Sequence, residues 1–100
     1  MPTFVLMTKL SPQLAGDPRG RKQVGREWMK KVKKVCPEVK WIAHYALLGR
    51  YDFMDIYEAP DAETAHKVSF LSLHEGATAA ESWHAMPYEN YVAMMDKVCE

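Results

Sequence analysis

The sequence is poor in cysteine, has no excess of charge of either sign and contains no long apolar run. Its two cysteines, Cys36 and Cys99, form neither a metal-binding motif nor a disulfide framework, so reduced thiols in the cytoplasm are expected. The formal net charge of zero lacks the basic excess that nucleic-acid-binding proteins usually carry. No apolar run approaches the length of a membrane span, and no secretory signal opens the chain. We therefore expect a cytoplasmic protein with no nucleic-acid or membrane partner.

What the sequence does contain is the composition of an ordinary globular domain. The chain has 100 residues, of which 48% are hydrophobic and 26% charged, which is enough for a two-layer core and little more. We expect a single domain over residues 1–100. Charge is unevenly spread, because residues 19–34 hold most of the basic side chains and residues 52–63 are acidic.

Two strand-like runs, residues 41–48 and 51–57, predict a β-hairpin. A two-residue loop at Gly49-Arg50 suits a type II′ turn, which needs a positive φ at its first central residue. The cross-strand pairs are then Leu48 with Tyr51, Ala46 with Phe53, His44 with Asp55 and Ile42 with Tyr57. Both faces of this hairpin are largely apolar, so each face needs a cover.

Apolar periodicity, capping residues and turn residues predict the other elements. In chain order they are a strand at 3–10, a loop at 11–20, a helix from 19–22 to Cys36-Pro37, the hairpin, a helix from Asp61 to about His74, a strand at 77–86 and a last helix with Pro87 at its first position. Asp61 can cap its helix, and Gly76 is a natural stop for it.

This order, βαββαβ with a C-terminal helix, is the α+β ferredoxin-like pattern. Right-handed crossovers place both main helices on one face of a four-stranded antiparallel sheet. If the helices take the other face, the open face carries these residues of the hairpin: Ile42, His44, Ala46, Phe53, Asp55 and Tyr57. Such a face is too apolar for water, so a homodimer is the expected cover, with further assembly left open.

Two segments resemble the GYD-domain family. Gly49-Arg50-Tyr51-Asp52 and the strand after it, up to Asp61, resemble the G-x-Y-D signature, and residues 75–83 resemble that family's last strand. The resemblance implies a dimeric α+β barrel, in which two ferredoxin-like sheets close around the dimer axis. It implies no particular activity and no cofactor. Relatives by architecture include small cofactor-free monooxygenases, isomerase-like enzymes and effector domains of regulators, which is an analogy of fold only.

The sharpest candidate site is the expected pair of His44 and Asp55. A carboxylate opposite an imidazole can orient it, raise its pKa and make it a general base. Tyr57 shares this face and could position a substrate oxygen, with Phe53 beside it as a ligand contact. The alternative is a polar pair that satisfies itself at a dimer interface.

Weaker candidates lie at the turn and on the last strand. Asp52 is expected to bond backbone amides, with Arg50 as an ion-pair partner, while Tyr51 is a possible ligand contact. Glu81 and Trp83 share a face and could bind a small polar aromatic ligand, although a tryptophan there is more often core.

No metal site is expected from the histidines. A metal needs three or four converging ligands, and His44, Asp55 and His84 converge only if His84 faces the same cavity.

Three functions therefore stay open. The first is a homodimeric module that binds or senses a small, partly apolar molecule. The second is a small cofactor-free enzyme that uses His44 and Asp55 in the barrel cavity. The third is a structural dimer whose barrel is filled by its own side chains.

Overall fold

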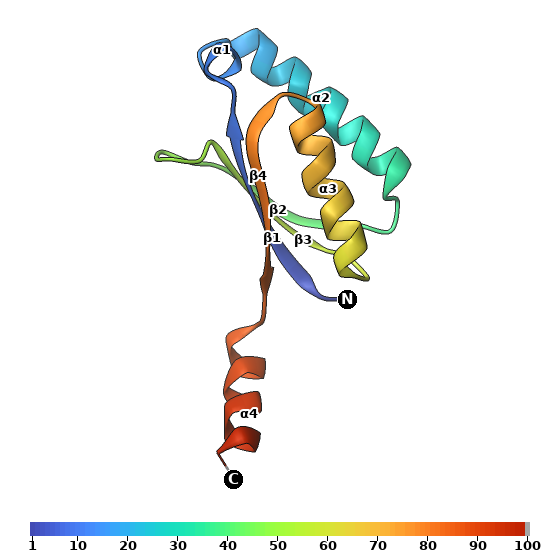
Figure 1. The fold of residues 1–100 in the computed structure, drawn as a ribbon, viewed down its shortest axis with the longest axis vertical. Coiled ribbons are helices and arrows are strands. Elements are labelled where there is room, and N and C mark those ends of the chain that lie inside the picture. The colour runs from blue at the N-terminus through green and yellow to red at the C-terminus, as the bar shows by residue number, and fades with distance from the viewer. Residues whose placement is uncertain (100) are drawn as a thin grey trace.

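The computed structural model describes residues 1–99, and its elements follow the expected order (Figure 1). They are β1 (Thr3–Leu10), α1 (Pro12–Ala15), α2 (Pro18–Val35), β2 (Lys40–Ala46), β3 (Phe53–Glu58), α3 (Ala62–His74), β4 (Ala77–Ala85) and α4 (Tyr88–Val98). The α+β, ferredoxin-like fold predicted from the sequence is confirmed.

The four strands form one antiparallel sheet in the order β2-β3-β1-β4, and α2 and α3 cover one of its faces (Figure 1). The core lies between this face and the two helices. Its buried members come from β1, from β3 and the residue after it, and from both helices and the C-cap of α2: Phe4, Leu6, Val32, Cys36, Tyr57, Ala59, Ala65 and Val68. The other face of the sheet has no cover within the described chain.

The predicted loop at 11–20 is wrong in part, because it contains the one-turn helix α1 and the start of α2. Ser11 caps α1 and Asp17 caps α2, where the Asp17 carboxylate accepts a 3.1 Å hydrogen bond from the Arg19 amide. Each cap is followed by a proline, whose fixed φ suits the first helical position. A Ser-Pro and an Asp-Pro pair therefore start helices here.

The limits of α3 are those expected from its caps. The Asp61 carboxylate accepts a 2.8 Å hydrogen bond from the Thr64 amide, and Gly76 follows the helix with φ +113°. A residue with a side chain is strained at that φ, so this glycine is required.

The hairpin pairs as predicted in its middle and differs at both ends. His44 lies opposite Asp55 and Ala46 opposite Phe53, which confirms the register there. A β-bulge shifts the register beyond His44, so Trp41 rather than Ile42 lies opposite Tyr57. The two-residue turn is also wrong: the strands end at Ala46 and Phe53, and Gly49 has no positive φ.

The sequence left open which face of the hairpin the helices cover, and they cover the face that carries His44, Asp55 and Tyr57. Phe4 pairs with Tyr57, and Leu6 with Asp55, so the buried face of β1 continues across β3 to His44 on β2. Both hairpin faces are apolar, and for this reason the alternation of residues could not choose between them. The uncovered face instead carries the side chains that alternate with these, namely Val5, Met7, Ala43, Tyr45, Met54, Ile56 and Trp83.

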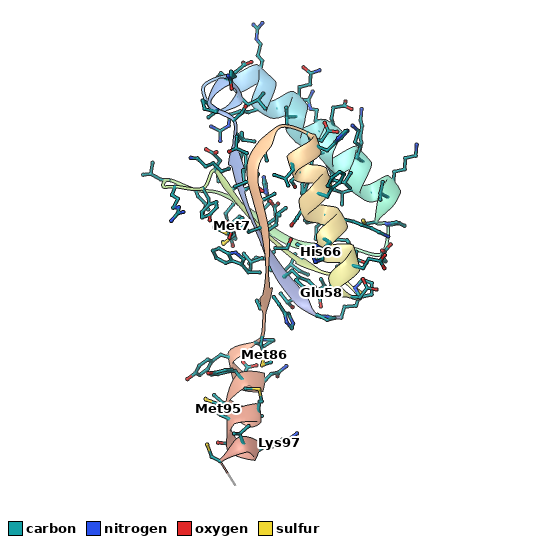
Figure 2. All side chains as sticks on the ribbon, in the orientation of Figure 1. Met7, Glu58, His66, Met86, Met95 and Lys97 are labelled. Carbon is teal, nitrogen blue, oxygen red and sulfur yellow. The ribbon has the colours of Figure 1, made fainter. Side chains whose placement is uncertain are left out.

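Helix α4 stands apart from the sheet and its two covering helices (Figure 1). Pro87 is its N-cap rather than its first helical residue, and no residue of α4 is buried. Met86 and Met95 lie on this projecting segment, away from the sheet (Figure 2). Helix α4 is thus an amphipathic helix whose apolar side is not packed on the rest of residues 1–99.

Candidate functional site

A pocket of about 540 Å³ lies between α2 and the helix-covered face of the sheet. Helix α2 supplies one wall through residues such as Val24 and Trp28, and the strands supply the other through Leu10 and Phe53. This volume is in the range of pockets that hold small molecules. The exposed surface of the walls is largely apolar, although about half of the lining residues have polar or charged groups.

The predicted pair of His44 and Asp55 lies in the wall of this pocket. Cross-strand pairing brings the two residues together, and the His44 Nδ1 atom lies 2.5 Å from Asp55 Oδ1. The Asp55 side chain is only 5% exposed, whereas the His44 side chain is 62% exposed. The ring of His44 also stacks on Phe53, with 5.4 Å between ring centroids. A buried carboxylate therefore holds an accessible imidazole in one orientation.

Burial raises the pKa of the Asp55 carboxyl above its ordinary value, and the neighbouring His44, which acts in the opposite direction, does not cancel the effect. An acid whose pKa is higher in the folded state binds its proton more tightly when folded. Its contribution to stability is present below the unfolded pKa and is lost as the pH rises through the folded pKa.

We expect an Asp55→Asn variant, which stays neutral, to gain stability relative to the wild type as the pH rises from about 4 to 7. Urea unfolding at several pH values measures the difference in free energy of unfolding. Asp61→Asn is the control, because hydrogen bonds from Thr64 lower the pKa of Asp61. This variant should lose stability relative to the wild type as the pH rises to about 4 and should show little further trend up to pH 7. If Asp55→Asn instead loses stability relative to the wild type as the pH rises to neutral, the pairing of Asp55 with His44 outweighs the cost of burying the carboxylate.

Tyr57 does not line the pocket, although the sequence placed it beside the pair. Its ring is fully buried, and its hydroxyl is 2.7 Å from the Ser82 hydroxyl, which in turn lies 2.7 Å from that of Ser69. Burial raises the pKa of the Tyr57 hydroxyl. These contacts make Tyr57 a core residue that joins the sheet to α3.

The candidates Tyr51, Glu81 and Trp83 form a cluster away from the pocket. The Tyr51 hydroxyl donates to Glu81 Oε2 at 2.5 Å, and the Trp83 indole donates to Glu81 Oε1 at 3.0 Å. These two hydrogen bonds lower the pKa of Glu81, and the bond to Glu81 raises the pKa of Tyr51. Trp83 is 47% exposed, so it is not a core residue. The cluster lies on the uncovered face.

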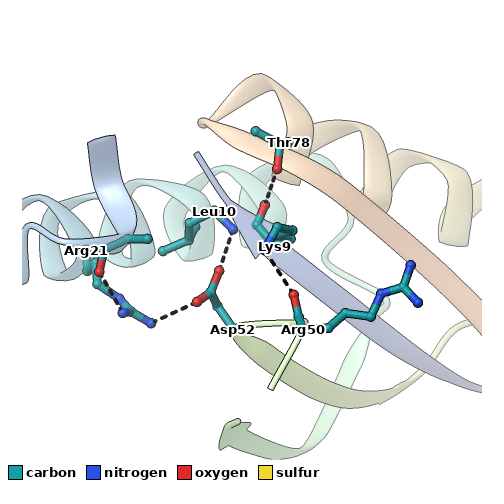
Figure 3. Close-up of polar contacts among 7 residues, drawn as sticks. Lys9, Leu10, Arg21, Arg50, Asp52 and Thr78 are labelled. Atoms are coloured by element: carbon teal, nitrogen blue, oxygen red, sulfur yellow. Dashed lines mark hydrogen bonds and ion pairs between the residues drawn. The ribbon is translucent and has the colours of Figure 1, made fainter. Parts of the chain in front are cut away.

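Asp52 bonds a backbone amide as predicted, but its ion-pair partner was wrong (Figure 3). Its Oδ2 accepts a 2.7 Å hydrogen bond from the Leu10 amide, at the bulge that ends β1. Its Oδ1 faces Arg21 on α2 at 3.8 Å, while the Arg50 guanidinium lies over the ring of Tyr51. Asp52 therefore joins the hairpin to β1 and to α2.

Sequence reasoning missed Arg21. Its guanidinium donates to the Ala15 carbonyl at 3.0 Å and faces Asp52 (Figure 3). It also lies 5.1 Å from the centre of the Phe53 ring. It thus ties the α1–α2 turn to the hairpin and forms part of the pocket wall. The basic run at 19–34 was the available signal, but nothing local marks one arginine of that run as inward-facing.

The rim of the pocket is positively charged. Arg21 forms an ion pair with Asp52, and Glu75 forms one with Lys31. Lys22 and Arg26 also line the pocket, and within residues 1–99 neither forms an ion pair.

Residues 1–99 contain no group of three or more His, Cys, Asp or Glu side chains arranged to hold a metal ion. The ring of His84 packs at a tilt against Phe4, with 5.3 Å between the ring centroids, and does not join the His44–Asp55 pair. In the same part of the chain, no helix has the length and apolar character needed to cross a membrane.

Comparison with known proteins shows which family the chain belongs to. The chain is 28% identical over 99 residues to a Thermus thermophilus protein named glutamine synthetase and cystathionine beta-lyase binding protein, covering 95% of this chain and 99% of that protein. The crystal structure of TTHA0845, also from Thermus thermophilus, superposes with a TM-score of 0.55 at 16% identity, over 87% of this chain and 95% of that one, which is a likeness of fold. The GYD domain model matches residues 4–95. The chain belongs to the GYD-domain family.

Proposed function

We propose that this protein is a homodimeric binding module that holds a small amphipathic anion in the pocket between α2 and the sheet. The observation that carries the proposal is the pocket itself, with the His44–Asp55 pair in its wall. Carboxylates whose pKa is shifted by burial beside a specific charged partner cluster at functional sites, and Asp55 beside His44 is such a group.

The lining supports the ligand class. Val24, Trp28 and Leu10 offer an apolar surface to the body of a ligand. Lys22 and Arg26 at the rim favour a negative charge at its outer end. The His44 imidazole can donate to or accept from a polar group of the ligand inside the pocket.

The homodimer is supported by the uncovered face of the sheet. Large apolar side chains there face water in one chain, including Tyr45 at 53% and Trp83 at 47% exposure. A face of this kind usually marks an interaction surface, and two such faces packed together form the barrel that the family resemblance implies. Cytoplasmic placement belongs to the same proposal, since Cys36 and Cys99 are free thiols.

The test uses octanoate and 1-octanol, which share an apolar chain and differ in charge. We expect both to shift the amide resonances of pocket residues such as Val24 and Trp28, with octanoate binding about fivefold more tightly because of an exposed ion pair worth about 1 kcal/mol. In an Arg26→Ala variant, the affinity for octanoate should fall close to the affinity for octanol. Lys34→Ala is the matched control, because Lys34 lies on the same helix and does not line the pocket. If neither probe moves pocket resonances, the proposal is wrong.

Catalysis is a second candidate, and the geometry of the pair favours it. Nδ1 of His44 faces Asp55, which leaves Nε2 free to exchange a proton with a bound molecule. In an enzyme, His44→Gln should keep the fold and the affinity for a pocket ligand while turnover is lost. In a binding module, the same variant should change affinity alone.

The Thermus relative supports the broader class. That protein is named for binding two enzymes, glutamine synthetase and cystathionine beta-lyase. We propose that the present chain is also a binding module, and that it binds protein partners as well as the pocket ligand.

A further inference from the structure

Helix α4 exposes a continuous apolar stripe. Tyr88, Tyr91 and Val98 are 74%, 44% and 77% exposed, and they recur with Met95 at helical spacing. The preceding Met86 is also exposed. An isolated helix of 11 residues is marginal in water, because most helical stability comes from packing of the apolar side. A stripe of this kind therefore needs a surface to pack on.

The size of the chain gives an independent estimate of the missing contact. Its accessible surface is 6906 Å², whereas a compact monomer of this mass exposes about 5,800 Å². The excess of roughly 1,100 Å² is comparable with the ~800 Å² that each partner contributes to a standard protein–protein interface. The radius of gyration, 15.2 Å, likewise exceeds the ~13 Å of a compact domain of 100 residues.

A second unpartnered apolar surface lies on the edge strand β2, where Tyr45 belongs to the open face of the sheet and Ile42 is the unpaired residue of the β-bulge. Ile42 and Tyr45 on the edge strand β2 are 51% and 53% exposed. Helix α4 leaves the sheet at the opposite edge, because β4 and β2 are the two edge strands. Only Met86 and Pro87 connect β4 to α4, and the proline ring fixes one of the few backbone angles that could turn the helix back. The two surfaces thus lie far apart in one chain.

We propose that α4 is an exchanged arm: it crosses to a second copy of this chain and packs its apolar stripe against the edge strand β2 of that copy, at Ile42 and Tyr45. The inference rests on the proposed homodimer and adds the element that closes it. A two-fold axis makes the contact twice, so each chain gives an arm and receives one.

The charge of α4 argues against a lipid membrane as the surface on which its apolar stripe packs. Between Tyr88 and Val98 the charged residues are Glu89, Asp96 and Lys97, a net charge of −1. Helices that lie on anionic membranes carry an excess of lysine and arginine on the polar face.

The test compares two aspartate substitutions on the same helix by sedimentation equilibrium. We expect Tyr91→Asp, in the stripe, to raise the dimer dissociation constant at least a hundredfold, because each dimer would bury two carboxylates. Ala93→Asp, on the opposite side of α4, should leave the constant within about threefold of the wild type. Ala93→Asp loses more intrinsic helix propensity than Tyr91→Asp does, so a loss of helicity alone would weaken the dimer of the control variant at least as much. Tyr45→Asp should weaken the dimer as Tyr91→Asp does.

Other outcomes separate the arm from the rest of the proposed function. A dimer that survives Tyr91→Asp but not Tyr45→Asp would leave the homodimer standing and overturn the arm. A wild-type protein that is monomeric would overturn the homodimer and the arm together. The octanoate titration would still test ligand binding in the pocket. Equal weakening by Tyr91→Asp and Ala93→Asp would also overturn the arm, since it would show that the stripe has no special role.

Discussion

Replacing Tyr57 by alanine is expected to lower the free energy of unfolding by about 4 kcal/mol, the usual cost of deleting a buried aromatic side chain. The ring is fully buried and stacks on Phe4, with 5.5 Å between centroids, and it packs against Trp41 at 5.1 Å. The change would remove the ring contacts that join β3 to β1 and to β2 and would leave a cavity in the core. Urea unfolding followed by circular dichroism measures the effect.

Tyr57→Phe is the matched control. It keeps the ring and removes only the hydroxyl, while Ser82 and Ser69 remain bonded to each other. The expected loss is about 1 kcal/mol, the usual worth of one buried hydrogen bond. A Tyr57→Ala variant of near wild-type stability that no longer binds octanoate would instead return Tyr57 to the role of a ligand contact, as the sequence predicted.

Replacing Asp52 by alanine is expected to cost about 2–3 kcal/mol of stability. The change leaves the amide of Leu10, a residue only 6% exposed, without its acceptor at the end of β1. It also removes the carboxylate that faces Arg21, and so loosens the contact of α2 with the hairpin. Thermal or urea unfolding measures the change, and the pocket wall should become more mobile with it.

Two variants test this account of Asp52. Asp52→Asn retains an acceptor for the Leu10 amide and should lose only about 1 kcal/mol. Arg50→Ala should be within about 0.5 kcal/mol of the wild type, because Arg50 is exposed and does not pair with Asp52. An Arg50→Ala variant as unstable as Asp52→Ala would contradict the network seen here.

Local pattern alone determined the order of elements, the caps and the central register of the hairpin. Asp61 and Gly76 mark the ends of α3 through interactions with residues three or fewer positions away, so the sequence contains the whole signal. The pairing of His44 with Asp55 follows from alternation along two adjacent strands. The polar pair of the candidate site was therefore predictable.

The environment of that pair was decided by tertiary structure. Both faces of the hairpin are apolar, and only the packing of β1 between β3 and β4 selects the face with Phe4 and Leu6 for the helices. The same choice buried Tyr57 and turned Tyr51, Glu81 and Trp83 away from the pocket. Arg21 became part of the wall through contacts with Asp52 and Phe53, more than thirty positions away.

Helix α4 shows the same division between what the local sequence determines and what the tertiary structure decides. Its apolar spacing determined that a helix forms after Pro87, because helical periodicity depends on neighbours three and four positions apart. Its place in the molecule depends on which surfaces the folded sheet leaves uncovered. The sequence by itself thus determined the elements and their order, and the tertiary structure decided which faces meet, because burial is a property of distant segments brought together and not of a local pattern.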